Sequence, residues 1–385
     1  MVAAACARFD PPENLEPVEA GQSYQAQYRT PDAERAMAGP LRSASMNAAR
    51  CLPSTPGDAQ PAAALEGERL TRNDLVDVRI GEDETFGGSY VISRDGALKL
   101  PFLTPIRAEG RATAEVEADI KAQLLRRDLY AEAPLTSVRV TDFAAVSVGV
   151  SGAVFEPRIV EIGRVGADEI DAARQIALGA STEGRNLSAA LRAAGGVRPD
   201  ADLSAVELVR GGQSYRLDLS EFFAGSTAHD VMLLNGDRVV VPSRGCFQDA
   251  LMRPSPISPP GVTLFLSNLT QPATANAPSA IGREVREIPY GTRYLQAVID
   301  ANCVGGARLS SADRSAVLFT RNPVTGVSIA IERDIEDLLR RADRDDFDPY
   351  LLPNDALACY DSTVSNIAEV GRVLGIFVAG AILAK

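Results

Sequence analysis

The pattern of apolar positions separates the first 64 residues from the rest of the chain. Residues 1–64 are rich in Ala, Pro, Ser and Gln, and they show neither the period of 2 of a strand nor the period of 3.6 of a helix. We therefore predict an extended or loosely folded arm over residues 1–64.

The next 80 residues predict a small α+β domain. Apolar residues alternate over 75–80, as expected for a strand with one buried face. Residues 89–93 and 97–102 flank the turn Arg94-Asp95-Gly96, and this order predicts a β-hairpin. Two further strands are predicted over 135–140 and 144–150.

A helix is predicted between the hairpin and these strands, over residues 113–127. Val116, Ile120 and Leu124 recur at helical spacing. Thr113 is the predicted N-cap, and carboxylates in the first turn favour the positive end of the helix dipole.

Beyond residue 145 the same order of elements occurs twice. Each copy predicts a strand, a helix ending at Gly-Gly, a hairpin and a closing strand that follows a turn ending in Asp. The double glycines are Gly195-Gly196 and Gly305-Gly306, and the closing turns are Asn235-Gly236-Asp237 and Pro353-Asn354-Asp355. The predicted parts are the arm (1–64), the α+β domain (65–145), the first copy (146–246), a Pro-rich linker (247–261), the second copy (262–362) and a C-terminal helix (363–385).

The C-terminal segment predicts an amphipathic helix that spans a membrane. From residue 364 to 384 a helix would be about 32 Å long, enough to cross a bilayer core. One stripe is polar and the remaining surface is apolar, so a ring of such helices would line a water-filled pore. The predicted pore-lining residues are Ser365, Asn366, Glu369 and Arg372, and those facing lipid or neighbouring helices are Ile367, Leu374, Phe377 and Val378. A buried core helix and an interfacial helix are the alternatives.

Charge and titratable residues exclude several classes of function. The net charge is −12 without a basic cluster, so we expect no nucleic-acid partner. The single histidine, His229, lies in a polar stretch and reads as a solvent-facing loop residue, with no nucleophile motif beside it. The five cysteines contain no Cys-x-x-Cys pair, and neither Gly211-Gly212 nor Gly305-Gly306 has the spacing of a phosphate loop. We predict no metal, no cofactor and no enzymatic activity.

The first six residues resemble the end of a secretion signal. Met1-Val-Ala-Ala-Ala-Cys6 places small residues before a cysteine, as in the lipobox of bacterial lipoproteins, and so predicts lipid attachment at Cys6. An alanine-rich N-terminus with an incidental cysteine is the alternative.

These segments resemble the outer-membrane polysaccharide export proteins. Glu68-Arg-Leu-Thr-Arg-Asn-Asp74-Leu-Val-Asp-Val78 is similar to the L-x-P-G-D-x-L-x-V opening of their polysaccharide export domain, with Arg72-Asn73 in place of Pro-Gly. The two copies resemble the β-grasp (SLBB) modules that follow this domain, over roughly residues 65–385. The implied fold is a multi-domain α+β chain: an export domain, two β-grasp repeats and the C-terminal transmembrane helix.

The resemblance implies a transport function. The chain would be a subunit of an oligomeric ring, expected to be an octamer, that exports capsular or extracellular polysaccharide across the periplasm and the outer membrane. Its implied partner is an inner-membrane polysaccharide co-polymerase or tyrosine autokinase, and most of the chain would be periplasmic. The alternative is a soluble or lipid-anchored periplasmic carbohydrate-binding protein.

An oxidising periplasm would favour disulfides among the four cysteines other than Cys6. Four cysteines allow three connectivities. We favour Cys303–Cys359, because both residues lie in the second copy, and Cys51–Cys246 would then attach the arm to the first copy.

Overall fold

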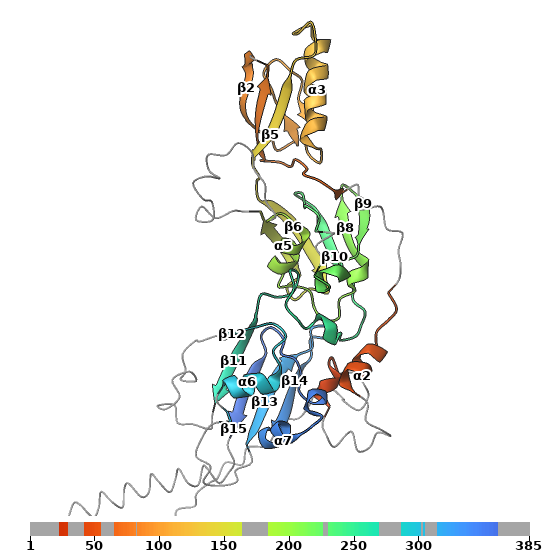
Figure 1. Ribbon diagram of the computed structural model, residues 1–385, viewed down its shortest axis with the longest axis vertical. Coiled ribbons are helices and arrows are strands. Elements are labelled where there is room, and N and C mark those ends of the chain that lie inside the picture. The colour runs from red at the N-terminus through yellow and green to blue at the C-terminus, as the bar shows by residue number, and fades with distance from the viewer. Residues whose placement is uncertain are drawn as a thin grey trace, which may run out of the picture. The chain divides into compact units, whose positions relative to one another are not determined.

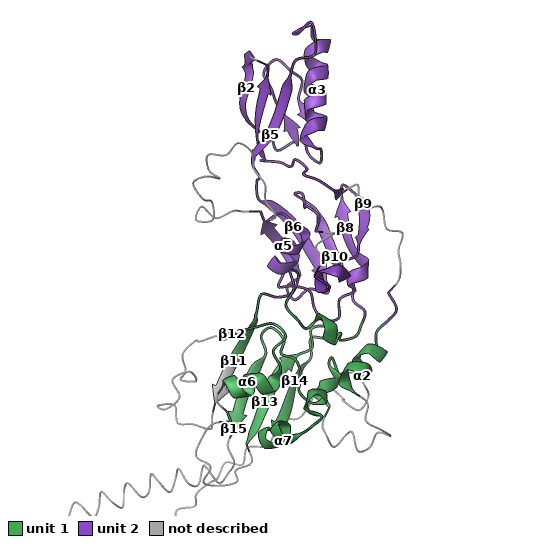
Figure 2. Cartoon of the chain, in the orientation of Figure 1, with its two compact units in different colours: residues 1–51, 245–254, 260–385 green, residues 52–244, 255–259 purple. Residues whose placement is uncertain are grey.

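The fold is described from a computed structural model of the 385-residue chain (Figure 1). The structure describes residues 23–29, 42–54, 65–81, 83–163, 184–225, 230–268, 286–301, 303–304 and 314–360. It divides into two compact units (Figure 2): unit 1 comprises residues 1–51, 245–254 and 260–385, and unit 2 comprises residues 52–244 and 255–259.

Unit 2 begins with a three-stranded domain, residues 65–145. Its elements are β1 (Leu75–Ile80), β2 (Asp83–Val91), β3 (Ala97–Leu98), β4 (Ile106–Arg107), α3 (Thr113–Arg126) and β5 (Thr136–Asp142). The main sheet has the antiparallel order β2-β1-β5. Val76 and Val78 alternate with half-buried residues on β1 and share one hydrophobic core with Val116 and Ile120 of α3. Alternate residues of the strand and residues three or four positions apart on the helix thus pack together in a two-layer core.

Two details of this domain correct the prediction. The predicted hairpin between residues 89–93 and 97–102 is wrong, because β2 pairs with β1 and β3 pairs with β4. The predicted turn itself is present, and the Gly96 amide donates to the Ser93 carbonyl (2.8 Å). The helix also begins one residue earlier than expected. Ala112 is the N-cap, and the backbone amide of Ala112 donates a hydrogen bond to the Glu115 carboxylate (2.8 Å).

Module 1, residues 146–244, is a five-stranded mixed sheet. Its elements are β6 (Val146–Gly152), β7 (Arg158–Ile162), α5 (Leu187–Ala193), η4 (Leu203–Ala205), β8 (Val206–Arg210), β9 (Gln213–Leu217), η5 (Ser220–Phe223) and β10 (Arg238–Val241). The strand order is β7-β6-β10-β8-β9, with β6 and β10 parallel. The strand predicted over 144–150 therefore belongs to this sheet as β6.

Module 2, residues 262–360, lies in unit 1 and has the same topology. Its elements are β11 (Val262–Asn268), β12 (Arg286–Ile288), α6 (Tyr294–Asp300), β13 (Ser315–Arg321), β14 (Ser328–Asp334), α7 (Ile335–Arg340), η7 (Arg344–Asp346) and β15 (Ala356–Tyr360). The order β12-β11-β15-β13-β14 repeats that of module 1, and β11 and β15 are parallel. This is the β-grasp arrangement in both sheets. Strands β7 and β12 and helix α7 were not predicted.

Parts of the predicted loose arm are packed against module 2. Residues 23–29 contain η1 (Ala26–Tyr28), residues 42–54 contain α2 (Ser43–Ala49), and all seven residues of the first segment are buried. In the predicted linker, Asp249–Leu251 forms η6, and Phe247 is buried against the ring of Tyr24. Aromatic and amide side chains, rather than a periodic apolar pattern, hold these segments, which is why periodicity did not reveal them.

Several predicted features lie outside the described residues. These are Cys6, His229, the Gly305-Gly306 helix end and the whole C-terminal segment with its predicted pore-lining residues (Ser365, Asn366, Glu369, Arg372) and lipid-facing residues (Ile367, Leu374, Phe377, Val378). Among the helices of the described residues, none combines the length and apolar character that crossing a bilayer requires.

Candidate functional site

Three turns with one geometry precede the central strands of the three sheets. They are the Asp turns 71–74, 234–237 and 352–355, each ending in a buried aspartate. In each, the carboxylate accepts a hydrogen bond from the amide three residues earlier, at 2.7, 2.8 and 2.8 Å respectively. The aspartate amide in turn donates to the carbonyl of that same residue, at 3.2, 3.1 and 3.2 Å. The side chain thus satisfies a backbone donor that would otherwise be buried without a partner.

The third residue of every Asp turn has a left-handed backbone. Its φ is +70° at Asn73, +86° at Gly236 and +71° at Asn354. Glycine adopts this conformation freely, and asparagine adopts it more readily than other residues with a side chain. Asn73 therefore preserves the turn at the position where the resembling motif has glycine.

The first two Asp turns meet inside unit 2, where the three-stranded domain joins module 1. The Asn235 amide donates to the Thr71 hydroxyl (3.4 Å), and Met232 of module 1 is part of the hydrophobic core of the three-stranded domain. The junction therefore combines turn-to-turn hydrogen bonding with a shared apolar core.

A fully buried ion pair crosses this junction. Arg185 donates from Nη1 to Oδ1 of Asp74 (2.9 Å), and neither side chain has exposed surface. The same carboxylate oxygen accepts from the Ala144 amide (2.9 Å), and the guanidinium lies over the Phe143 ring. Burial raises the pKa of Asp74 and lowers that of Arg185, and their mutual attraction opposes both shifts. Gly163 leaves room for this arginine, since a Cβ there would lie 2.3 Å from its Cγ.

The second Asp turn has a cation of its own. Arg210 on β8 donates from Nη2 to Oδ2 of Asp237 (2.7 Å) and to the Met232 carbonyl (2.7 Å). Only 3% of the Asp237 side chain and 16% of the Arg210 side chain are exposed, so this pair is largely shielded from water.

The third Asp turn differs. Asp355 is buried, and within the described residues no cation pairs with it. Burial raises the pKa of Asp355 to about 7, against the lowering effect of the Leu352 amide and the nearby Thr320 hydroxyl.

Module 2 instead holds a buried arginine that donates to backbone carbonyls. Arg333 on β14 is 5% exposed and donates from Nη2 to the carbonyls of Gln27, Tyr28 and Arg29 (3.0–3.1 Å). Its Nε donates to the Phe347 carbonyl (3.0 Å). Burial lowers the pKa of Arg333 to about 10. One side chain thereby attaches the N-terminal segment 23–29 to module 2.

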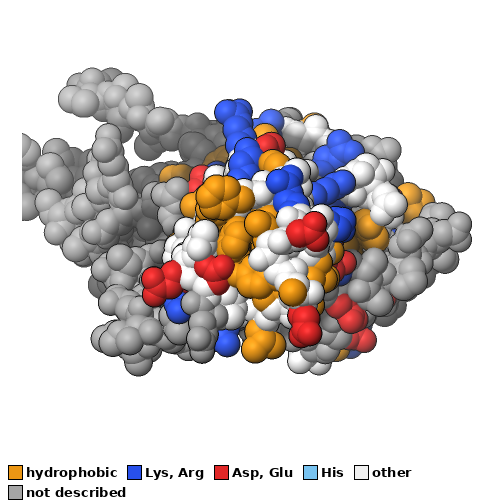
Figure 3. Space-filling model, turned by 90° about the horizontal axis from the view of Figure 1, so that it is seen from above, with side chains coloured by type: hydrophobic (Ala, Val, Ile, Leu, Met, Phe, Trp, Pro, Cys, Tyr) orange, Lys and Arg blue, Asp and Glu red, His pale blue; other side chains and the backbone are white. Residues whose placement is uncertain are grey.

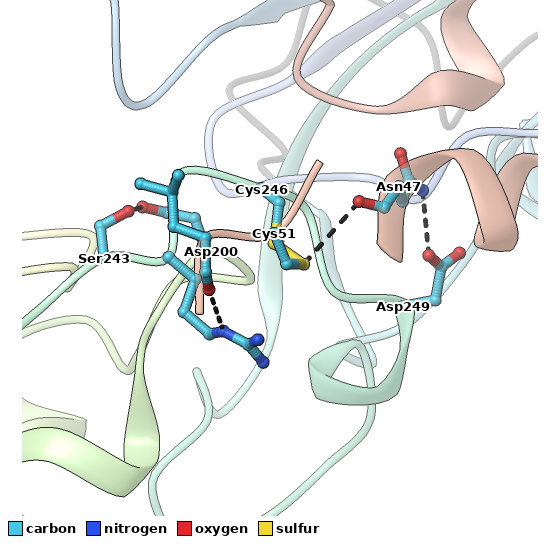
Figure 4. Close-up of a disulfide and its surroundings, with 8 residues drawn as sticks. Asn47, Cys51, Asp200, Ser243, Cys246 and Asp249 are labelled. Carbon is cyan, nitrogen blue, oxygen red and sulfur yellow. Dashed lines mark hydrogen bonds between the residues drawn. A yellow bond between two sulfur atoms is a disulfide. The ribbon is translucent and has the colours of Figure 1, made fainter. Parts of the chain in front are cut away.

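Both favoured cysteine pairs are joined in the structure. Cys51 bonds to Cys246 (Cα–Cα 4.7 Å), and Cys303 bonds to Cys359 (Cα–Cα 6.0 Å). The prediction that the Cys51–Cys246 disulfide attaches the arm to module 1 was wrong. Cys246 belongs to unit 1, so the disulfide attaches the arm to the unit that contains module 2. Beside it, Asn47 donates to the Asp249 carboxylate at 2.9 Å (Figure 4).

The three-stranded domain carries a group of exposed apolar residues. Phe102 is 71% and Leu135 is 85% exposed, and Leu125 in the last turn of α3 and Leu129 after the helix are also exposed. Figure 3, which views the molecule from above, shows hydrophobic side chains gathered on one face next to Lys and Arg side chains. Large exposed apolar side chains of this kind are candidates for contact with another protein where they adjoin.

Comparison with known families identifies two parts of unit 2. The family described as "Polysaccharide biosynthesis/export protein" matches residues 62–141, which cover the three-stranded domain. This match agrees with the resemblance to the polysaccharide export protein family. The family described as "SLBB domain" matches residues 173–241, within module 1. No curated protein matches the chain.

The two family matches fit the domain order. An export domain followed by an SLBB domain gives the multi-domain α+β layout that the sequence predicted, and module 2 repeats the strand order of the SLBB-matched module 1. The roles of Arg185, Arg210 and Arg333 were missed by sequence reasoning. The partner of each arginine is distant in sequence, so no local pattern could reveal the pairing.

Proposed function

We propose that this polysaccharide export protein is a subunit of an oligomeric outer-membrane channel that exports capsular or extracellular polysaccharide. The role is conduction rather than catalysis, with most of the chain in the periplasm. The observation that carries the proposal is the export domain directly followed by an SLBB module and a second module of identical strand order.

The buried junction in unit 2 supports a rigid channel wall. The Asp74–Arg185 pair and the shared apolar core around Met232 link the three-stranded domain to module 1 without exposed charge. A buried pair favours one geometry, because any displacement leaves a charge without its partner. A wall built from repeated subunits requires such a fixed angle between its domains.

Exposed apolar surface supports contacts with other proteins. The exposed apolar residues would lie against a neighbouring subunit of an octameric ring, or against an inner-membrane polysaccharide co-polymerase or tyrosine autokinase. These residues are Phe102, Leu125, Leu129 and Leu135. The disulfides Cys51–Cys246 and Cys303–Cys359 fit an oxidising periplasm. Lipid attachment at Cys6 would add an anchor in the outer membrane.

The C-terminal segment provides the test. Single cysteines introduced along residues 362–385 should react with a membrane-impermeant thiol reagent at every third or fourth position, including Ser365, Glu369 and Arg372. Truncation after Asp361 should leave the described units folded and abolish export. No labelling along the segment, together with aggregation of the truncated protein, would indicate a buried core helix and overturn the pore.

A lipid-anchored or soluble carbohydrate-binding protein is the second candidate, favoured by the pocket described in the next subsection. It needs the same modules but no membrane-spanning helix. A purified, full-length protein that stays monodisperse without detergent would support this candidate over the channel.

A further inference from the structure

A small polar pocket opens at the junction of the three-stranded domain and module 1. It has a volume of about 230 Å³ and is lined by Arg72, Asn73, Arg94, Ala145 and Asn235. It lies where the Asp turns 71–74 and 234–237 meet, so the buried Asp74–Arg185 pair fixes the backbone beneath it. Pockets for drug-sized ligands have volumes of about 300–1,000 Å³, so this smaller pocket suits a single sugar unit.

The charge of the pocket is positive, although the whole chain carries −12. Within the described residues, no hydrogen bond or ion pair engages the Arg94 guanidinium. The carboxylate of neighbouring Asp95 is paired with Lys99 (2.8 Å). Arg72 is held by Glu109, with 3.1 Å between Nε and Oε1. Two guanidinium groups and one carboxylate thus leave one net positive charge at the opening, at a side chain that is free to bind.

Neutral donors accompany this charge. The Oδ1 atom of Asn235 accepts a hydrogen bond from the Ser147 amide (3.1 Å), which leaves its Nδ2 group as the available donor. The Asn73 side chain is exposed on a left-handed turn residue whose backbone is fixed by the Asp turn. Guanidinium groups bind carboxylates through paired hydrogen bonds, and amide side chains bind hydroxyl groups.

A larger pocket along β1 and β2 lacks this character. It is lined by Arg79, Asp83 and Glu84 among others. Arg79 is already paired with Asp77 (2.8 Å), and the two carboxylates would repel an anion. The larger cavity therefore does not suit an acidic sugar.

We propose that the pocket at Arg72, Arg94 and Asn235 binds the anionic group of an acidic sugar unit, with a uronic acid as the simplest case. Arg94 binds the carboxylate, and the asparagine amides bind ring hydroxyl groups. The inference rests on the proposed export of polysaccharide and specifies its substrate as an acidic glycan that contacts each subunit at this junction.

The test measures binding of short oligogalacturonides to the purified full-length protein in detergent by isothermal titration calorimetry. Maltooligosaccharides of the same length and inorganic phosphate are the comparison ligands. We expect binding of the oligogalacturonide only, weakened at least about tenfold by Arg94→Gln, since loss of one charge-assisted contact corresponds to about that factor. Arg139→Gln, an exposed arginine of the same domain outside the pocket, is the matched control and should bind like the wild type.

Three results would overturn the inference: equal affinity for the neutral oligosaccharide, phosphate binding as tight as oligogalacturonide binding, or unchanged affinity in Arg94→Gln. Circular dichroism of that variant checks its fold, which should be intact because Arg94 is exposed. Surface polysaccharide in cells lacking the chain is measured separately. A surface defect without oligogalacturonide binding refutes only this pocket, whereas normal surface polysaccharide refutes the proposed export function itself.

Discussion

Modules 1 and 2 share one strand order but are stabilised by different chemistry. Module 1 pairs its Asp-turn carboxylate, Asp237, with Arg210. Module 2 leaves the equivalent Asp355 without a cation among the described residues, and it relies on the Cys303–Cys359 disulfide and on Arg333. The same topology therefore does not require the same interactions.

The difference shows what each module depends on. The polar contacts of module 1 come from its own strands and from the adjoining export domain, all within unit 2. Module 2 depends on segments from the start of the chain, which are attached through Arg333 and the Cys51–Cys246 disulfide. We expect module 2 to be sensitive to truncation of the arm and to reduction, and module 1 to tolerate both.

The largest effect should come from Arg333→Met. Three carbonyls of the segment 23–29 would lose a charged donor, at a cost of at least about 3 kcal/mol, because each buried acceptor left without a partner costs about 1–3 kcal/mol. Hydrogen exchange should then rise in residues 23–29 and in module 2 but not in module 1. Arg340→Met, at a 78% exposed arginine of α7, is the control and should change neither. Equal protection of residues 23–29 in both variants would contradict the proposed attachment.

Removing the Cys51–Cys246 disulfide should have the next largest effect. Cys51→Ser combined with Cys246→Ser should lower the free energy of unfolding of unit 1 by about 2–4 kcal/mol, because the bond restricts the unfolded chain between residues 195 positions apart. Denaturant unfolding of unit 1, monitored by hydrogen exchange, measures this change. Mass spectrometry of the unreduced wild-type protein should find neither cysteine alkylated, and alkylation of both would refute the pair.

The same substitution at the two Asp turns should act in opposite directions. Asp237→Asn leaves Arg210 without its carboxylate and should destabilise module 1 by about 2–3 kcal/mol. The pKa of Asp355 is raised from 3.8 to about 7, so the folded protein retains a proton that the unfolded chain releases, and stability falls as pH rises through this window. Asp355→Asn should therefore remove that decline and make module 2 more stable than wild type above pH 7.

Thermal unfolding of both variants from pH 4 to pH 8 tests this pair of predictions. A pH profile of Asp355→Asn that parallels the wild type would show that Asp355 does not titrate in this range. A neutral effect of Asp237→Asn would show that the Arg210 pair adds no net stability.

The sequence predicted the elements whose own side chains form the core. Strand β1, helix α3 and the order of elements in the two copies follow from apolar periodicity. The predicted hairpin at residues 89–102 was wrong because a turn signal does not determine which strands pair. Strand β2 pairs instead with β1, which precedes it by only residues 81–82. Sequence patterns are local, whereas strand pairing is decided by the whole sheet.

The candidate site was less accessible to sequence reasoning. The cysteine pairs followed from placing both members of one pair in the same copy. The Asp74–Arg185 pair joins residues 111 positions apart and has no local pattern. The pocket at Arg94 likewise depends on two turns meeting, which only the folded junction of unit 2 shows.

The proposed channel is tested most directly by the mass of the full-length protein after extraction from membranes in mild detergent. Native mass spectrometry with negative-stain electron microscopy should find a closed ring, with the proposed eight subunits. The control variant Arg340→Met, at an exposed arginine of α7, should form the same ring as the wild type. A monodisperse monomer extracted under the same conditions would contradict the channel.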